Sequence, residues 1–106
     1  EAPVRESAAL ALGKVAQRGD RPTVEALARC LDGEPDRTVR ASAAFVLGRV
    51  ALRDDVRAIE ALTYRFEDED EDERVSAVAG QALKRLGMDV DVDDEEGIDE
   101  KACVLS

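Results

Sequence analysis

The chain repeats itself at an interval of 35 residues, and this internal repeat limits its fold more than any other feature. When residues 4–31 are aligned with residues 39–66, 14 of 28 positions are identical. A weaker third copy begins at Val75, at an offset of 36 residues. Self-similarity at a period of about 20–50 residues is typical of architectures in which each unit buries its apolar face against the next. The sequence therefore predicts a stack of similar units.

The first part of the second copy has the periodicity of an amphipathic helix. Its apolar residues recur three and four positions apart and so share one helix face; they are Val39, Ala43, Val46, Leu47 and Val50. Asp36 precedes this run and is placed to accept hydrogen bonds from the free N–H groups of the first turn. Gly13 and Gly48 occupy the same late position in the two copies, where we expect close packing or a bend.

A second helix follows in each copy. In the first copy Asp20 is the expected cap, and Pro22 lies in the first turn, where proline is tolerated. In the second copy Asp54 or Asp55 begins the helix. The expected apolar faces are Val24, Leu27 and Leu31 in the first copy, and Val56, Ile59, Leu62 and Phe66 in the second.

A break and a final helix complete the pattern. Residues 32–35, Asp-Gly-Glu-Pro, interrupt the chain between the first two copies. The third copy predicts a helix over about residues 72–86, with Gly87 as its C-terminal stop. We therefore expect an all-α fold of five helices, arranged as two pairs and a lone fifth.

Two motifs connect these units to a known family. The first, D-x-x-V-R-x-x-A-A-x-x-L-G, consists here of Asp36, Val39, Arg40, Ala43, Ala44, Leu47 and Gly48. The second, G-D-x-x-x-V-x-A-L, consists of Gly19, Asp20, Val24, Ala26 and Leu27. Over residues 1–87 the chain resembles the HEAT repeat family, in its short, phycobilisome lyase-type form. The resemblance implies a short α-solenoid of about two and a half helical hairpins, with repeats at 1–34, 35–71 and 72–87.

The third copy departs from the family pattern in ways that suggest a terminal cap. Ser76 replaces the motif arginine, Gly80 lies within the helix, and Lys84 replaces the late glycine. This copy also lacks a second helix.

The net charge of −10 is concentrated in two segments. Residues 1–66 carry only +1, whereas residues 67–73, EDEDEDE, contribute −7. We interpret residues 67–73 as a solvated loop whose like charges repel. Residues 88–106 are interpreted as an acidic, disordered tail, which either keeps the chain soluble or folds back on the basic residues of the repeats. This acidity disfavours nucleic acid as a partner.

The composition excludes several kinds of chemistry. The chain has no histidine, which removes His-based triads, His metal ligands and histidine proton shuttles. Some members of the resembled repeat class are enzymes, among them a di-iron hydroxylase with His-Glu pairs and bilin lyases. Without histidine the iron chemistry cannot be carried over. We therefore expect no enzyme, no catalytic residues, no cofactor and no metal site.

The two cysteines, Cys30 and Cys103, bear on compartment and modification. They show neither CxxC nor metal spacing, so we expect a reducing compartment and a cytoplasmic protein. Cys30 is expected to be a core-facing or half-buried thiol. The ending Cys103-Val104-Leu105-Ser106 has the C-a-a-X form that suggests farnesylation, although the acidic stretch before it is repelled by anionic lipid. No apolar run approaches the length of a membrane span.

The resemblance places the working surface on the second helices, which line the concave face of HEAT stacks and commonly hold partners there. The outward positions on these helices are Glu25, Arg29, Arg57, Glu60 and Tyr64. Tyrosine and arginine dominate interface hot spots, although Tyr64 also fits an ordinary surface side chain packed on its neighbour. Glu25 and Arg29 have the spacing of an i,i+4 ion pair.

Two pairs of arginines recur with the repeat, Arg5/Arg40 and Arg18/Arg53. One interpretation is a ladder that binds phosphates or an acidic partner. We favour a structural interpretation, in which each arginine forms an ion pair or cap with the adjacent repeat. The expected carboxylate partners are Asp20, Asp36 and Asp55.

The leading functional interpretation is a non-catalytic scaffold that binds a protein partner on the concave face. The alternatives are an accessory subunit of an enzyme system, such as a lyase-type or modification factor, a nucleic-acid binder that uses the slightly basic repeats, and a prenylated adaptor. Two and a half repeats leave an apolar face at each end. Either further repeats precede Glu1, or the ends self-associate.

Overall fold

The computed structural model describes residues 2–90, and these residues form five helices without a strand. The helices are α1 (Ala2–Val15), α2 (Arg21–Gly33), α3 (Arg37–Val50), α4 (Val56–Glu67) and α5 (Glu73–Arg85). The all-α prediction and the number of helices are confirmed. The segment 91–106, which contains most of the acidic tail and the ending at Cys103, lies outside the described residues.

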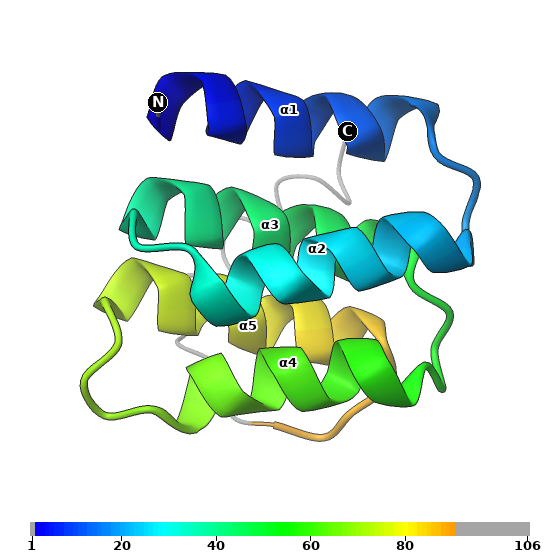
Figure 1. The fold of residues 1–106 in the computed structure, drawn as a ribbon. Coiled ribbons are helices and arrows are strands. Elements are labelled where there is room, and N and C mark those ends of the chain that lie inside the picture. The colour runs from blue at the N-terminus through cyan, green and yellow to red at the C-terminus, as the bar shows by residue number, and fades with distance from the viewer. Residues whose placement is uncertain (1, 91–106) are drawn as a thin grey trace, which may run out of the picture.

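The helices form two layers (Figure 1). The A layer consists of α1, α3 and α5, which lie side by side and run in the same direction, and the B layer consists of α2 and α4. Within this stack α2 packs on α3 and α4 packs on α5, whereas α1 packs on α3 and has little contact with α2. The described residues thus form a short helical solenoid in which each B-layer helix packs mainly against the A-layer helix that follows it.

Aspartates begin four of the helices. The side chains of Asp20, Asp36, Asp55 and Asp72 each accept a hydrogen bond from a backbone N–H in the first turn of the following helix. Such a cap satisfies a donor that the helix itself leaves free, and replacing it by alanine typically costs about 1 kcal/mol. The α5 helix ends at the predicted stop, where Gly87 adopts a left-handed backbone with φ of 91°.

The core lies between the two layers. The predicted faces of α2 and α3 are buried, and the largest fully buried side chains are Leu27, Leu31, Leu47, Leu62 and Leu83. The predicted face of α4 is wrong at its first position, because 67% of Val56 is exposed. Val56 is the first residue of α4 and directly follows the capping Asp55 at the end of the loop.

The repeated glycines set the spacing of the A layer. A Cβ built on Gly48 would lie 2.6 Å from the Cβ of Ala82 and 2.9 Å from its Cα. The equivalent atom on Gly13 would lie 2.6 Å from a methyl group of Val46. These distances are shorter than any ordinary contact, so α1 and α3, and α3 and α5, approach as closely as they do because glycine has no side chain.

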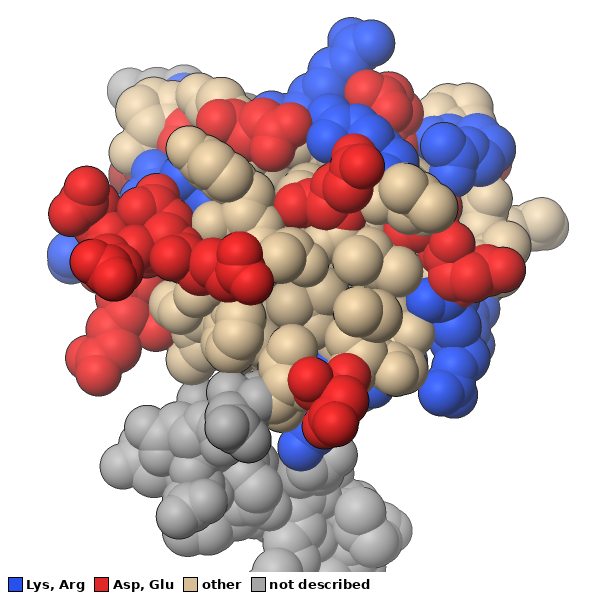
Figure 2. All heavy atoms as spheres, turned by 90° about the horizontal axis from the view of Figure 1, so that it is seen from below, with Lys and Arg blue, Asp and Glu red and all other residues tan. Residues whose placement is uncertain are grey.

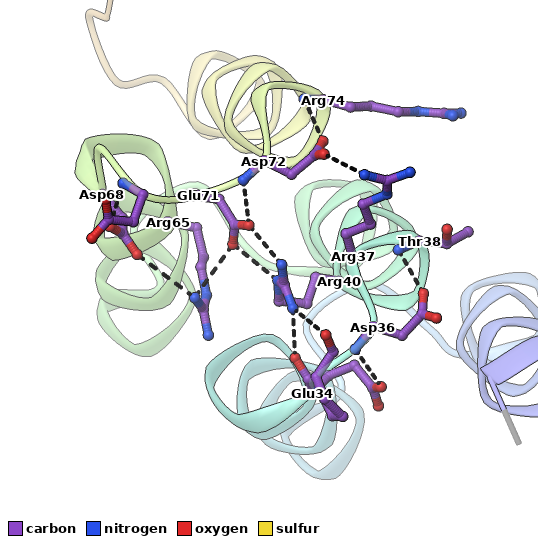
Figure 3. A network of polar contacts seen from close by, with 12 residues as sticks. Glu34, Asp36, Arg37, Thr38, Arg40, Arg65, Asp68, Glu71, Asp72 and Arg74 are labelled. Carbon is purple, nitrogen blue, oxygen red and sulfur yellow. Dashed lines mark hydrogen bonds and ion pairs between the residues drawn. The ribbon is translucent and has the colours of Figure 1, made fainter.

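A buried carboxylate at the end of the second repeat holds α3 and α4 of that repeat together (Figure 3). Glu71 accepts hydrogen bonds from Nε and Nη2 of Arg40 at 3.0 and 2.7 Å, and Nη1 of Arg65 lies 3.3 Å from its Oε2. Only 1% of the Glu71 side chain is exposed. The expectation that residues 67–73 are a uniformly solvated loop is therefore wrong at this position, because two arginines neutralise the carboxylate.

An equivalent Arg–Glu ion pair occurs in the first repeat. Nε and Nη2 of Arg5 donate to the two carboxylate oxygens of Glu34, both at 2.8 Å. Arg5 and Arg40 each form an ion pair, as the structural interpretation predicted. The expected aspartate partners and the expected contact with the adjacent repeat are wrong, because each arginine pairs with a glutamate at the end of its own repeat. Arg18 and Arg53 form no ion pair within residues 2–90, so the expectation is wrong for them.

Candidate functional site

The predicted binding residues lie on the B layer, on the two helices that pack side by side. Glu25 Oε2 accepts from Nε of Arg29 at 3.2 Å, which confirms the expected i,i+4 pair. Glu25 Oε1 accepts from Nε of Arg57 on α4 at 3.3 Å, and Nη2 of Arg57 donates to Asp32 at 3.0 Å. The structure therefore joins three of the five predicted residues in one network that crosses from α2 to α4.

These hydrogen bonds hold the charges of the network in place. Donation from Arg29 and then from Arg57 lowers the pKa of Glu25 below its ordinary value of 4.5. Donation to Asp32 is the largest cause that raises the pKa of Arg57, and donation to Glu25 adds to it. Both shifts favour the charged forms, so the hydrogen bonds of the network stabilise charges of both signs on this part of the surface.

The other two predicted residues, Glu60 and Tyr64, lie one turn apart on α4 and outside this network. Tyr64 is 62% exposed, which fits an interface residue and equally an ordinary surface tyrosine that is half-packed on its neighbour. The guanidinium carbon of Arg65 lies 5.4 Å from the centroid of the Tyr64 ring. Arg65 also donates to the carbonyl oxygens of Leu31 and Asp32 at 2.9 and 2.8 Å, which anchors it against α2. The Tyr64 ring is thus supported on one side and open to solvent.

The face formed by α4 and α5 places an uncharged centre within a ring of charged side chains (Figure 2). The acidic side chains gather at the edge that carries the α4–α5 loop. Val56, which the sequence had assigned to the core, adds one exposed apolar side chain to α4. Its position at the start of α4, directly after the capping Asp55, was the available signal.

A second exposed surface lies at the N-terminal end of the stack. Val4, Leu12 and Val15 of α1 are 67%, 36% and 79% exposed, whereas the equivalent Val39, Leu47 and Val50 of α3 are buried. The difference arises because α2 covers α3 and no described helix covers α1 in the same way. We name Val4, Ala8, Ala11, Leu12 and Val15 the α1 stripe.

The described residues offer no arrangement of metal ligands. Within residues 2–90 no group of three or more Cys, Asp or Glu side chains is placed to hold a metal ion.

Cys30 is partly buried, as expected, and burial raises the pKa of its thiol above the ordinary value of 9.0. A raised pKa disfavours the thiolate, which is the reactive form. No helix between residues 2 and 90 is long and apolar enough to span a membrane.

The architecture has two layers of stacked helices, repeated glycines at the contacts between A-layer helices, and an Arg–Glu pair that recurs within each of the first two repeats. The family model for HEAT repeats matches residues 1–84. The chain belongs to the HEAT repeat family. No curated protein and no solved structure matches it. The short, phycobilisome lyase-type form of the HEAT repeat stays a prediction from the sequence motifs.

HEAT repeats generally mediate contacts between proteins, which agrees with the predicted class of function. The family match identifies neither a binding partner nor a binding residue. The evidence for a binding surface is therefore the geometry of α2 and α4.

Proposed function

We propose that this HEAT-repeat chain is a non-catalytic, cytoplasmic interaction module that holds a protein partner on the concave face formed by α2 and α4. The observation that carries the proposal is the exposed ring of Tyr64 beside a fixed network of charges. Aromatic and arginine side chains dominate the energy of protein interfaces because they bury a large area and also form directed polar contacts.

The rigidity of this surface supports the same proposal. Glu25, Arg29 and Arg57 hold one another across two helices, and Arg65 is fixed by two backbone carbonyls. Side chains that are ordered before binding lose less conformational entropy when a partner arrives. Charges of both signs also favour partners with a complementary pattern over partners with one uniform charge.

The test is capture of a partner by the tagged chain from source lysate, with quantification by mass spectrometry. Tyr64→Ala is expected to reduce the specific partner about 30-fold, since a hot spot contributes about 2 kcal/mol or more. Phe45→Ala is the matched control, because Phe45 is an exposed aromatic under an arginine on α3 in the A layer. Equal retention by both variants would show that the B-layer surface does not bind the partner.

We also propose that the α1 stripe binds a second copy of this chain. The apolar residues of the α1 stripe are spaced nearly symmetrically about the middle of the helix. A two-fold axis at that point therefore places Val4 opposite Val15, and Ala8 opposite Ala11, of the other copy. Antiparallel pairing of this kind is self-complementary and closes the assembly as a dimer.

Light scattering after size-exclusion chromatography tests the pairing. The wild type is expected to be a dimer and Val15→Asp a monomer, because the substitution places a charge in the apolar contact. Val56→Asp, at an equally exposed valine on α4, is expected to leave the dimer intact. A monomeric wild type at all concentrations would contradict the pairing without affecting the proposal for Tyr64.

A further inference from the structure

An open pocket of about 280 Å³ lies at the edge of the A layer, and three arginines line it. Because the three A-layer helices run in the same direction, their C-terminal ends meet at this edge (Figure 1). Arg18 follows α1, Arg49 lies in the last turn of α3 and Arg85 is the last residue of α5. Gly48 of α3 is the fourth residue that lines the pocket.

The three pocket arginines differ from the arginines that hold the fold together. Arg5, Arg40 and Arg57 each form a close ion pair with a carboxylate. Within residues 2–90, Arg18, Arg49 and Arg85 form no ion pair. For Arg49 the one directed contact is with the ring of Phe45, whose centroid lies 5.6 Å from the guanidinium carbon. Three charges therefore line one pocket, and no carboxylate among residues 2–90 forms an ion pair with any of them.

Further basic residues raise the positive potential at this edge. The guanidinium of Arg53 lies against Gly87, where an added Cβ would be 2.8 Å from Nη2. Lys14 lies in the last turn of α1 and Lys84 in the last turn of α5. Asp54 is the exposed acid of the adjoining α3–α4 turn and lowers this potential in part.

The helix dipole explains part of this placement. Basic side chains in the last turn stabilise the negative end of a helix, typically by about 0.3–1 kcal/mol each. That effect places cations near each C-terminus but does not require three of them to line one pocket. Backbone hydrogen bonds also neutralise part of the negative charge at these helix ends. The N–H groups of Leu86, Gly87 and Met88 donate to the last carbonyls of α5, and Gly19 N–H donates to Val50 O at the end of α3.

We propose that this pocket binds a phosphate-type oxyanion. A phosphate or diphosphate carries two or more negative charges and accepts hydrogen bonds from several directions, whereas one carboxylate carries a single charge and is satisfied by one bidentate arginine. Three guanidinium groups from three separate helices match the first kind of ligand.

The site is independent of the proposed partner surface. It uses the C-terminal ends of the A-layer helices, and none of its lining residues belongs to α2 or α4. The two proposals therefore succeed or fail separately.

The experiment titrates the full chain with inorganic diphosphate at low ionic strength and follows backbone amide resonances by NMR. Saturable shifts are expected at Gly48 and Arg49. The double variant R18Q/R85Q is expected to bind at least tenfold more weakly. Arg74→Gln is the matched control, because Arg74 is exposed, its side chain has no ion pair with any residue from 2 to 90, and it lies at the opposite end of α5 (Figure 3).

Two further measurements make the outcome decisive. R18Q/R85Q is expected to unfold cooperatively, with a midpoint at most about 8 °C below the wild type because one last-turn charge of α5 is lost, and this separates loss of binding from loss of folding. A neutral peptide with one phosphoserine, compared with its unphosphorylated form, distinguishes a phosphoryl group carried on a larger molecule from the free ion. The proposal is overturned if neither diphosphate nor the phosphopeptide gives saturable shifts, or if Arg74→Gln weakens binding as much as R18Q/R85Q.

Discussion

The contact between α3 and α5 depends on the absence of a side chain at position 48, and this dependence can be measured. The substitution Gly48→Ala adds one methyl group whose carbon would lie 2.6 Å from the Cβ and 2.9 Å from the Cα of Ala82. Carbon atoms normally approach to about 3.5–4.0 Å. Because a backbone atom is among the obstacles, rotation of a side chain cannot relieve the overlap and α5 has to move.

The expected magnitude follows from two opposing effects. Overpacking a core typically costs about 1–3 kcal/mol, and this overlap belongs at the upper end of that range. Alanine is better than glycine inside a helix by about 1 kcal/mol. Gly48→Ala is therefore expected to reduce the free energy of unfolding by about 2 kcal/mol, which lowers the midpoint temperature by roughly 8–16 °C for a domain of this size.

Gly33→Ala is the matched control. Gly33 is the last residue of α2, and an added Cβ would meet no atom within 4 Å. The same substitution there is expected to raise stability by about 0.4–1 kcal/mol, because only the gain in backbone entropy remains. Urea unfolding followed by circular dichroism measures both variants. If Gly48→Ala is as stable as Gly33→Ala, then α3 and α5 are not packed as closely as described.

Two electrostatic predictions follow from the Arg–Glu pairs. Glu71→Ala is expected to reduce the free energy of unfolding in urea by about 3 kcal/mol, because it leaves Arg40 partly buried without its carboxylate. Glu69→Ala, at an exposed position of the same loop, is expected to change this free energy by less than about 0.5 kcal/mol. Equal effects of the two substitutions would mean that Glu71 is solvated. Donation from Arg5 lowers the pKa of Glu34 below 4.5, so the carboxylate stabilises the fold above pH 4.5 and this contribution is lost as the pH falls through the lowered pKa. Glu34→Gln is expected to be less stable at pH 7 and to lose less stability below pH 4.5 than the wild type; an unchanged pH profile would argue against the pair.

Local signals in the sequence were sufficient for the helices. The repeat, the 3.6-residue periodicity and the aspartate caps predicted five helices and most of the core, because these features depend on neighbouring residues along the chain. The glycines at positions 13 and 48 also predicted close packing correctly. Val56 was misassigned because periodicity alone does not show that the first residue of α4 is exposed.

The partners of the charged residues could not be predicted in the same way. Arg5 and Glu34 are 29 residues apart, and Arg40 and Glu71 are 31 residues apart, so their pairing depends on how the two helices of one repeat fold against each other. The seven acidic residues at 67–73 look alike in the sequence, and only packing distinguishes the buried Glu71 from its exposed neighbours. The set of unpaired arginines at the A-layer edge became visible for the same reason, once the partners of the other arginines were known.

The central claim is that this HEAT-repeat chain holds a protein partner through α2 and α4, and site-specific photo-crosslinking tests it most directly. A benzoylphenylalanine placed at position 64 or at position 45 replaces one exposed aromatic side chain by another, on the B layer and the A layer respectively. The two probes are irradiated in source lysate and the adducts identified by mass spectrometry. The account predicts a specific adduct from position 64 that is absent from position 45. An adduct from position 45 with none from position 64 would contradict it.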